Sequence, residues 1–193
     1  YWCFLTVCLE YFPNATIYGF DIFTYGSDEL HRLQEGNPNL DRSVMFKGDQ
    51  ENDDDLEEFV SLHGGDFDII IDDGGHTMRQ QQISMGVLFD EVKSGGHYII
   101  EDLHTCSGEW PSLYGYQTIN DGDTLTTDLL KSIINKDDSV RETNYLTKDL
   151  LDYIRDNTKS CRIEIGKEKY VNPKGYTYQW PTTISFMEKK WVK

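Results

Sequence analysis

Hydrophobic and polar positions along the chain form two repeating patterns that predict strands and helices in turn. Short apolar runs predict buried strands at 15–20, 43–46, 67–71 and 98–100. Apolar residues three or four positions apart predict helices at 2–12, 27–34, 53–62 and 79–92. The run Phe67 to Ile71 is nearly continuous in hydrophobic residues, which is typical of a strand covered on both faces. The alternation of helix and strand predicts an α/β fold with a parallel sheet.

The pattern changes after the fourth predicted strand. Residues 103–126 form a long stretch rich in Gly, Ser, Trp and Tyr, and a loop of this length inside a compact domain is usually functional. Helices are then expected at 128–135 and 147–157, and strands at 161–171 and 183–188 with a turn between them. We predict a single domain over residues 1–193, because domains of about 100–200 residues are usual.

Composition excludes several classes of partner. The chain has 193 residues, with 18 Lys and Arg against 34 Asp and Glu, giving a formal charge of −16. Such a chain lacks the positive surface that nucleic acids and anionic membranes require, so we expect neither as a partner. No apolar run is long enough to span a bilayer. The four cysteines form no CxxC pair, which favours a reducing compartment, and we expect a cytoplasmic protein.

Acidic residues follow each of the predicted strands. They are Asp21, Asp49, the pair Asp72-Asp73 and the pair Glu101-Asp102. In open α/β sheets, ligands bind at the carboxyl ends of the strands, so these side chains are candidates for one shared site. The alternative is that each acid caps a helix or turn, which suffices for a single residue but explains the pairs less well.

Two kinds of site follow from these positions. Asp21 is placed to bind ribose hydroxyls, either of a nicotinamide dinucleotide or of S-adenosylmethionine. The dinucleotide requires a GxGxxG turn about 20 residues earlier, which falls before Tyr1. The segment from Asp72 to His76, together with Glu101-Asp102, offers several carboxylate oxygens and one imidazole, which is a suitable set for Mg²⁺ with a base beside it. Two unrelated capped loops are the alternative.

Several motifs resemble those of a known family. They are 11–15 (YFPNA), 17–21 (IYGFD), 48–50 (GDQ), 71–76 (IDDGGH), 95–96 (GG), 100–103 (IEDL) with Thr105, and 110–111 (WP). Together these motifs resemble class I S-adenosylmethionine-dependent methyltransferases, most strongly the metal-dependent macrolide sugar O-methyltransferases of the mycinamicin and demethylmacrocin type. The resemblance covers about residues 11–111, and further on it is one of topology only.

The resemblance implies a Rossmann-like class I methyltransferase fold, with a mostly parallel sheet, helices on both faces and a C-terminal antiparallel hairpin. It also implies S-adenosylmethionine and Mg²⁺ as cofactors. Asp21 would bind the ribose, Asp49 and Gln50 would lie near the adenosine, and Asp72 would lie near the methionine end. The metal ligands would be Asp73, Glu101 and Asp102. His76 would be the general base.

The expected acceptor is a hydroxyl of a sugar or another vicinal diol. The 103–126 loop is its expected wall, with Trp110 and Tyr114 as candidate contacts, and His104 is close enough in sequence to reach the site. A packed surface loop is the alternative for these residues. The resemblance also raises the expectation of a homo-oligomer, because the related enzymes assemble.

Two departures from the family pattern stand out. Gly75 replaces a usual Ser, and the first strand with its glycine-rich cofactor loop has no counterpart after Tyr1. We expect either that these segments lie upstream of Tyr1, with this chain a truncated form, or that another segment substitutes. Without them the chain would expose a sheet edge and bind cofactor poorly. A non-catalytic binding module and a nicotinamide-dependent oxidoreductase therefore remain alternatives to a methyltransferase.

Overall fold

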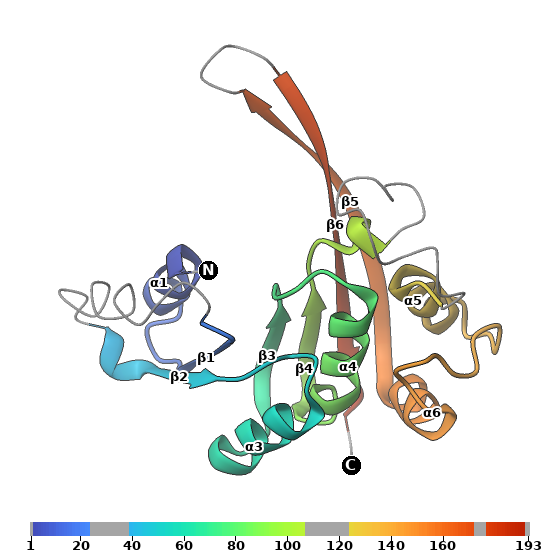
Figure 1. Ribbon diagram of the computed structural model, residues 1–193, viewed down its shortest axis with the longest axis horizontal. Helices are drawn as coiled ribbons and strands as arrows, with labels where there is room; N and C mark the ends of the chain where they lie inside the picture. The colour runs from blue at the N-terminus through green and yellow to red at the C-terminus, as the bar shows by residue number, and fades with distance from the viewer. Residues whose placement is uncertain (1, 24–38, 107–123, 172–176, 192–193) are drawn as a thin grey trace.

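The computed structural model describes residues 2–23, 39–106, 124–171 and 177–191 (Figure 1). The helices and strands in chain order are α1 (Trp2–Tyr11), β1 (Ile17–Asp21), β2 (Ser43–Lys47), α3 (Asp53–His63), β3 (Phe67–Asp72), α4 (Met78–Leu88), β4 (Val92–Ile100), α5 (Thr126–Asn135), α6 (Lys148–Asn157), β5 (Thr158–Val171) and β6 (Thr177–Lys189). Two short 3₁₀ helices, η1 (Leu40–Arg42) and η2 (Leu103–Cys106), complete the set. The predicted helix 27–34, the turn 172–175 and most of the 103–126 loop lie outside the described residues.

The strands form two sheets. β1 pairs with β2 in parallel, and the other four strands follow the order β3-β4-β6-β5. β3 and β4 are parallel, whereas β6 runs antiparallel to both β4 and β5. The predicted C-terminal hairpin is therefore present, and in Figure 1 its far end extends well beyond the body of the molecule.

An aromatic cluster packs between the two sheets, whose strands β1 and β3 are not paired by backbone hydrogen bonds. Its members are Tyr18, Phe20, Phe46, Phe59 and Phe67. Tyr18 of β1 lies edge-on to Phe67 of β3, with ring centroids 5.4 Å apart, and Phe59 of α3 stacks on the same Phe67 ring. Edge-to-face and offset stacked pairs add stabilisation beyond the area that they bury. Side-chain packing therefore connects the β1–β2 sheet to the four-stranded sheet, which backbone pairing does not connect.

Helix boundaries follow local capping signals. The Asn52 side chain accepts a hydrogen bond from the Asp54 N–H and caps the start of α3. Three aspartates in the first turn interact favourably with the helix dipole. Thr77 and Gln80 form a reciprocal capping box at the start of α4. These caps explain why both helices begin within one residue of the predicted positions.

The end of α4 differs from the prediction. The helix was expected to run to residue 92 and the next strand to begin at residue 98, but α4 ends at Leu88 and β4 begins at Val92. Val92 pairs with Phe67 of β3, so strand pairing replaces the predicted last turn of helix. Gly95 and Gly96 lie within β4, and the left-handed φ of 79° at Gly95 accommodates an irregularity in its register with β3.

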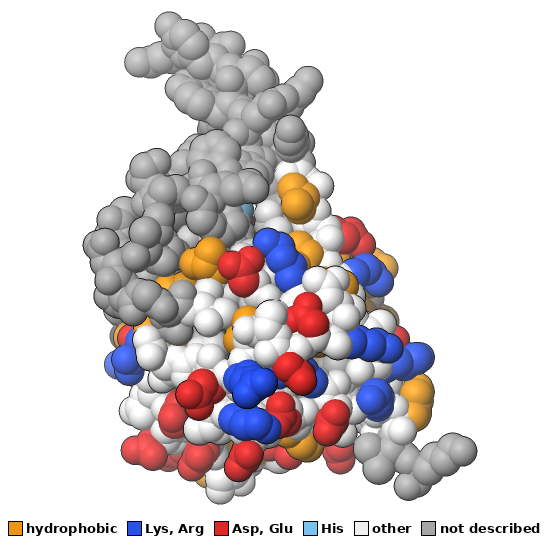
Figure 2. Space-filling view, turned by 90° about the vertical axis from the view of Figure 1, so that its right-hand side faces the viewer, with side chains coloured by type: hydrophobic (Ala, Val, Ile, Leu, Met, Phe, Trp, Pro, Cys, Tyr) orange, Lys and Arg blue, Asp and Glu red, His pale blue; other side chains and the backbone are white. Residues whose placement is uncertain are grey.

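The main hydrophobic core lies between the four-stranded sheet and helices α4, α5 and α6, which cover it in Figure 1. Phe89, Tyr98, Leu129, Leu151 and Met187 are all fully buried within it. No helix in the described ranges is long and apolar enough to cross a bilayer. On the side of α5 and α6, Figure 2 shows acidic and basic side chains interspersed.

Candidate active site at the carboxyl ends of the strands

The acidic pairs after β3 and β4 lie side by side because these strands are parallel neighbours. The register pairs Asp72 with Ile100, so Asp73 follows one strand where Glu101 and Asp102 follow the other. The Glu101 N–H donates to the Asp72 carbonyl oxygen at 2.9 Å and continues the pairing past the end of β4. The predicted convergence of the two pairs is thus present in the structure.

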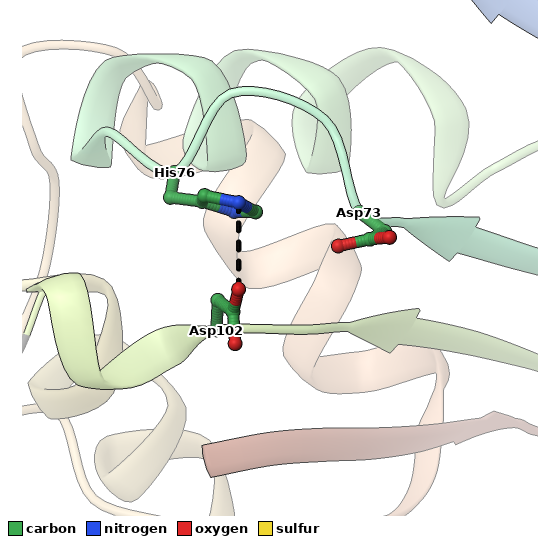
Figure 3. Close-up of side chains that lie close together, drawn as sticks. All are labelled: Asp73, His76 and Asp102. Atoms are coloured by element: carbon green, nitrogen blue, oxygen red, sulfur yellow. Dashed lines mark ion pairs between the residues drawn. The ribbon is translucent and has the colours of Figure 1, made fainter. Parts of the chain in front are cut away.

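Three side chains form the centre of the site. Asp73, His76 and Asp102 each offer one ligand atom, and these atoms all lie within 4.8 Å of one another. His76 Nε2 and Asp102 Oδ2 form an ion pair at 3.4 Å. Figure 3 shows the three side chains converging from the turn after β3 and from the end of β4. Asp102 has a φ of 51°, an uncommon left-handed conformation for a non-glycine residue, and such strain is typical of functional sites.

The carboxylates of the site disfavour one another's charge. Burial raises the pKa of Asp73; nearby His76 lowers it, and Asp102 raises it further. Burial also raises the pKa of Glu101, and Asp73 and Asp102 add to that effect. Glu101 is thus close enough to interact with both aspartates, although it is outside the 4.8 Å group. Half-buried carboxylates that repel one another fit a divalent cation, which would relieve the repulsion.

His104 lies next to this group. Its side chain is 9% exposed, and its Nδ1 lies 3.7 Å from Asp102 Oδ1. Burial lowers its pKa, Asp102 opposes that change, and His76 adds to it. The other two candidate acceptor contacts, Trp110 and Tyr114, are outside the described residues.

Asp21 and Asp49 lie at the carboxyl ends of β1 and β2. Asp21 Oδ1 accepts a hydrogen bond from the Phe23 N–H at 2.7 Å, and Asp49 Oδ1 accepts one from the Glu51 N–H at 2.9 Å. Gly48 N–H donates to the Asp21 carbonyl oxygen, which keeps the two strand ends together. One oxygen of each carboxylate therefore stabilises a local turn, as the capping alternative expects, and this use is compatible with ligand binding through the other oxygen.

Asp72 is the most deeply buried acid of the site. Its Oδ1 accepts hydrogen bonds from Gln50 Nε2 at 3.1 Å and from the Gly74 N–H at 3.4 Å. Its Oδ2 is buried, and the buried Tyr98 hydroxyl lies near the carboxylate and lowers the pKa of Asp72. Burial raises the pKa of Asp72 from 3.8 to about 7, against the lowering effect of the Gln50 and Gly74 hydrogen bonds. A buried carboxylate oxygen in this state fits a cationic group, such as the ammonium of the methionine part of S-adenosylmethionine.

We expect the stability of the ligand-free chain to fall as the pH rises from about 4 to 7. Over this range Asp72 stays protonated in the folded state but ionises in the unfolded state, so the folded state binds more protons. The loss has an upper bound of about 4 kcal/mol and levels off above pH 7. Urea unfolding of the wild type and of Asp72→Asn at several pH values measures it. An equal slope in both proteins would contradict the assignment to Asp72.

The structure adds residues that the sequence pattern did not single out. Thr105 Oγ1 lies 2.6 Å from the His76 carbonyl oxygen and 2.9 Å from that of Asp102, so it connects the two halves of the site. Ser84, Gln81 and Gln82 of α4 are buried, although the predicted apolar stripe of this helix contained none of them. Three consecutive glutamines in a helix against a buried sheet were the available signal.

No family model matches the chain. The arrangement of sheet, helices and hairpin is that of the Rossmann-like class I methyltransferases. A solved structure titled MycE Methyltransferase from the Mycinamycin Biosynthetic Pathway, in complex with Mg and SAH, superposes with a TM-score of 0.56 at 28% identity. The match covers 93% of this chain and 38% of that one, and a second structure of that enzyme, which also contains Mycinamycin VI, gives the same TM-score.

The curated relatives that the chain matches include sugar O-methyltransferases of macrolides and tetracenomycins. It is 36% identical over 126 residues to 8-demethyl-8-(2-methoxy-alpha-L-rhamnosyl)-tetracenomycin-C 3'-O-methyltransferase of Streptomyces olivaceus. It is 35% identical over 127 residues to Mycinamicin VI 2''-O-methyltransferase of Micromonospora griseorubida. Each match covers 65% of this chain but only 29% and 28% of the relative, so the chain aligns with less than a third of their length. The predicted fold and family resemblance are confirmed.

Proposed function

We propose that this chain is the catalytic domain of an S-adenosylmethionine-dependent O-methyltransferase that requires Mg²⁺ and acts on a sugar hydroxyl of a small glycoside. The observation that carries the proposal is the convergence of Asp73, His76 and Asp102 at the ends of two parallel strands. The similarity to MycE, whose structure contains Mg and SAH, supports the choice of cofactors.

We propose the roles that the resemblance implies for the residues of the site. Asp73, Glu101 and Asp102 would hold Mg²⁺, and a bound Mg²⁺ supplies positive charge that stabilises an oxygen anion. Asp21 would hold the ribose of S-adenosylmethionine, Asp49 would lie near its adenosine and Asp72 near its methionine end. S-adenosylmethionine supplies an electrophilic methyl group on a sulfonium.

His76 would act as the general base. Its Nε2 accepts the proton of the acceptor hydroxyl, and the Asp102 carboxylate beside that atom stabilises the resulting imidazolium. His104 would help to enclose the acceptor on the other side of Asp102. We assign the 103–126 loop, with Trp110 and Tyr114, as the acceptor wall. A homo-oligomer and a cytoplasmic location complete the proposal, without a nucleic acid or a membrane as partner.

Calorimetric titration of S-adenosylhomocysteine, with and without Mg²⁺, tests the proposal together with a methyl-transfer assay on glycosides that have neighbouring hydroxyls. The titration uses this chain and, in parallel, the same chain with any upstream coding sequence restored. We expect binding, and Mg²⁺-dependent transfer that stops when the metal is chelated. Binding without transfer in both forms would favour a non-catalytic binding module. Binding of a nicotinamide dinucleotide in place of S-adenosylhomocysteine would favour an oxidoreductase.

A further inference from the structure

Gln50 occupies a position where β2, β3 and α4 meet. It follows the end of β2, and its side chain reaches three separate elements. The Nε2 amide donates to Asp72 Oδ1 at 3.1 Å and to Ser84 Oγ at 2.9 Å. The Oε1 oxygen accepts from the Gly75 N–H at 2.5 Å. Both N–H donors and the carbonyl oxygen of this amide are therefore used within the protein.

These contacts fix the turn that carries two of the three central side chains. Asp73 and His76 flank Gly74 and Gly75, and Gln50 bonds to the turn at both Asp72 and Gly75. The fit is close, because a Cβ added to Gly74 would lie 2.1 Å from Gln50 Oε1. Gly74 is thus needed for the close approach of the Gln50 amide.

The other side of the turn has its own anchors. Thr105 contacts the His76 carbonyl oxygen, and the Thr77–Gln80 capping box begins α4 directly after His76. Gln50 ties the turn to the β1–β2 half of the molecule, which has no backbone pairing with β3, and the neighbouring Glu51 pairs with Arg79 of α4 at 3.2 Å. Ser84 is 2% exposed and holds the Gln50 amide from α4.

We propose that Gln50 is a positioning residue, which orders the 72–76 turn so that Asp73 and His76 face Asp102. This differs from the direct adenosine contact that the family resemblance implies for Gln50. The ordering of the turn is a property of the chain itself, whereas its effect on methyl transfer rests on the proposed function.

The test replaces Gln50 with Met, which keeps the length of the side chain but removes all three hydrogen bonds. The matched control is Gln82→Met, because Gln82 is a buried glutamine that loses its hydrogen bonds with the Thr124 carbonyl oxygen and Thr143 Oγ1, away from the turn. Hydrogen–deuterium exchange of the 72–77 segment is the first measurement. We expect exchange in this segment to be about tenfold faster in Gln50→Met and unchanged in Gln82→Met.

Steady-state methyl transfer and Mn²⁺ affinity are the second measurements. We expect kcat to fall about tenfold in Gln50→Met and Mn²⁺ binding to weaken, with little change in the KM for S-adenosylmethionine. Unchanged exchange in the turn would overturn the proposal. So would a raised KM for S-adenosylmethionine with unchanged kcat, since that result defines a cofactor contact. If the wild type transfers no methyl group, the proposed function fails, and the exchange measurement still decides the role of Gln50.

Discussion

Asp73→Asn is expected to weaken Mn²⁺ binding by about 100-fold or more and to remove metal-dependent methyl transfer. Asp73 contributes one of the three converging ligand atoms, and the amide of Asn is a neutral, weaker ligand for a hard cation. Mn²⁺ binding is followed by electron paramagnetic resonance, and transfer by the release of S-adenosylhomocysteine. Burial disfavours the charged form of Asp73, and neutral Asn has nearly the same shape as Asp. The variant should therefore fold at least as stably as the wild type.

The matched control for this variant is Asp68→Asn. Asp68 lies in β3, the strand that Asp73 follows, but its side chain is 76% exposed and pairs with Lys93 at the surface. Surface ion pairs contribute about 0–1 kcal/mol, so this variant should keep both metal affinity and activity. Equal Mn²⁺ affinity in Asp73→Asn and in Asp68→Asn would remove Asp73 from the metal site.

His76→Ala is expected to lower kcat by about 100- to 10,000-fold while Mn²⁺ affinity changes little. Loss of a general base has effects of this size. The measurement distinguishes two roles for His76, because its ligand atom lies within 4.8 Å of those of Asp73 and Asp102 and could also bind the metal. Mn²⁺ affinity that falls as far as it does in Asp73→Asn would instead identify His76 as a metal ligand.

His97→Gln provides the corresponding control. His97 lies within β4, paired with Ile69 and Glu188, and is not part of the central group. The variant should retain the kcat and the pH–rate profile of the wild type. A similar loss in both histidine variants would indicate a general effect of the substitutions on the fold and not a missing base.

Much of the site could be predicted from the sequence because it depends on strand ends. The apolar run of β3 and the acidic pairs that follow β3 and β4 are consecutive in the chain, and parallel neighbours bring their ends to one edge. The sequence did not predict which residues form the central group. His76 joins Asp73 and Asp102 within 4.8 Å and Glu101 does not, because the turn after β3 and the left-handed conformation of Asp102 set where each side chain points.

Long-range contacts account for the other differences. Gln50 meets Asp72, Gly75 and Ser84, which are 22, 25 and 34 positions away, and no local pattern reports such a contact. The start of β4 at Val92 likewise depends on Phe67, its partner in a different strand. Buried polar residues in α4 also broke the apolar periodicity on which the helix prediction relied.

The sequence by itself determined the order of helices and strands, the caps at Asn52 and Thr77, and the delivery of acids to the strand ends. These features depend on residues within a few positions of one another, where backbone preference and side-chain capping act directly. Only the tertiary structure decided that two sheets are joined by an aromatic cluster, that β4 begins at Val92, and that Gln50 holds the turn bearing Asp73 and His76. Each of these depends on packing and hydrogen bonds between segments that meet only when the chain is folded.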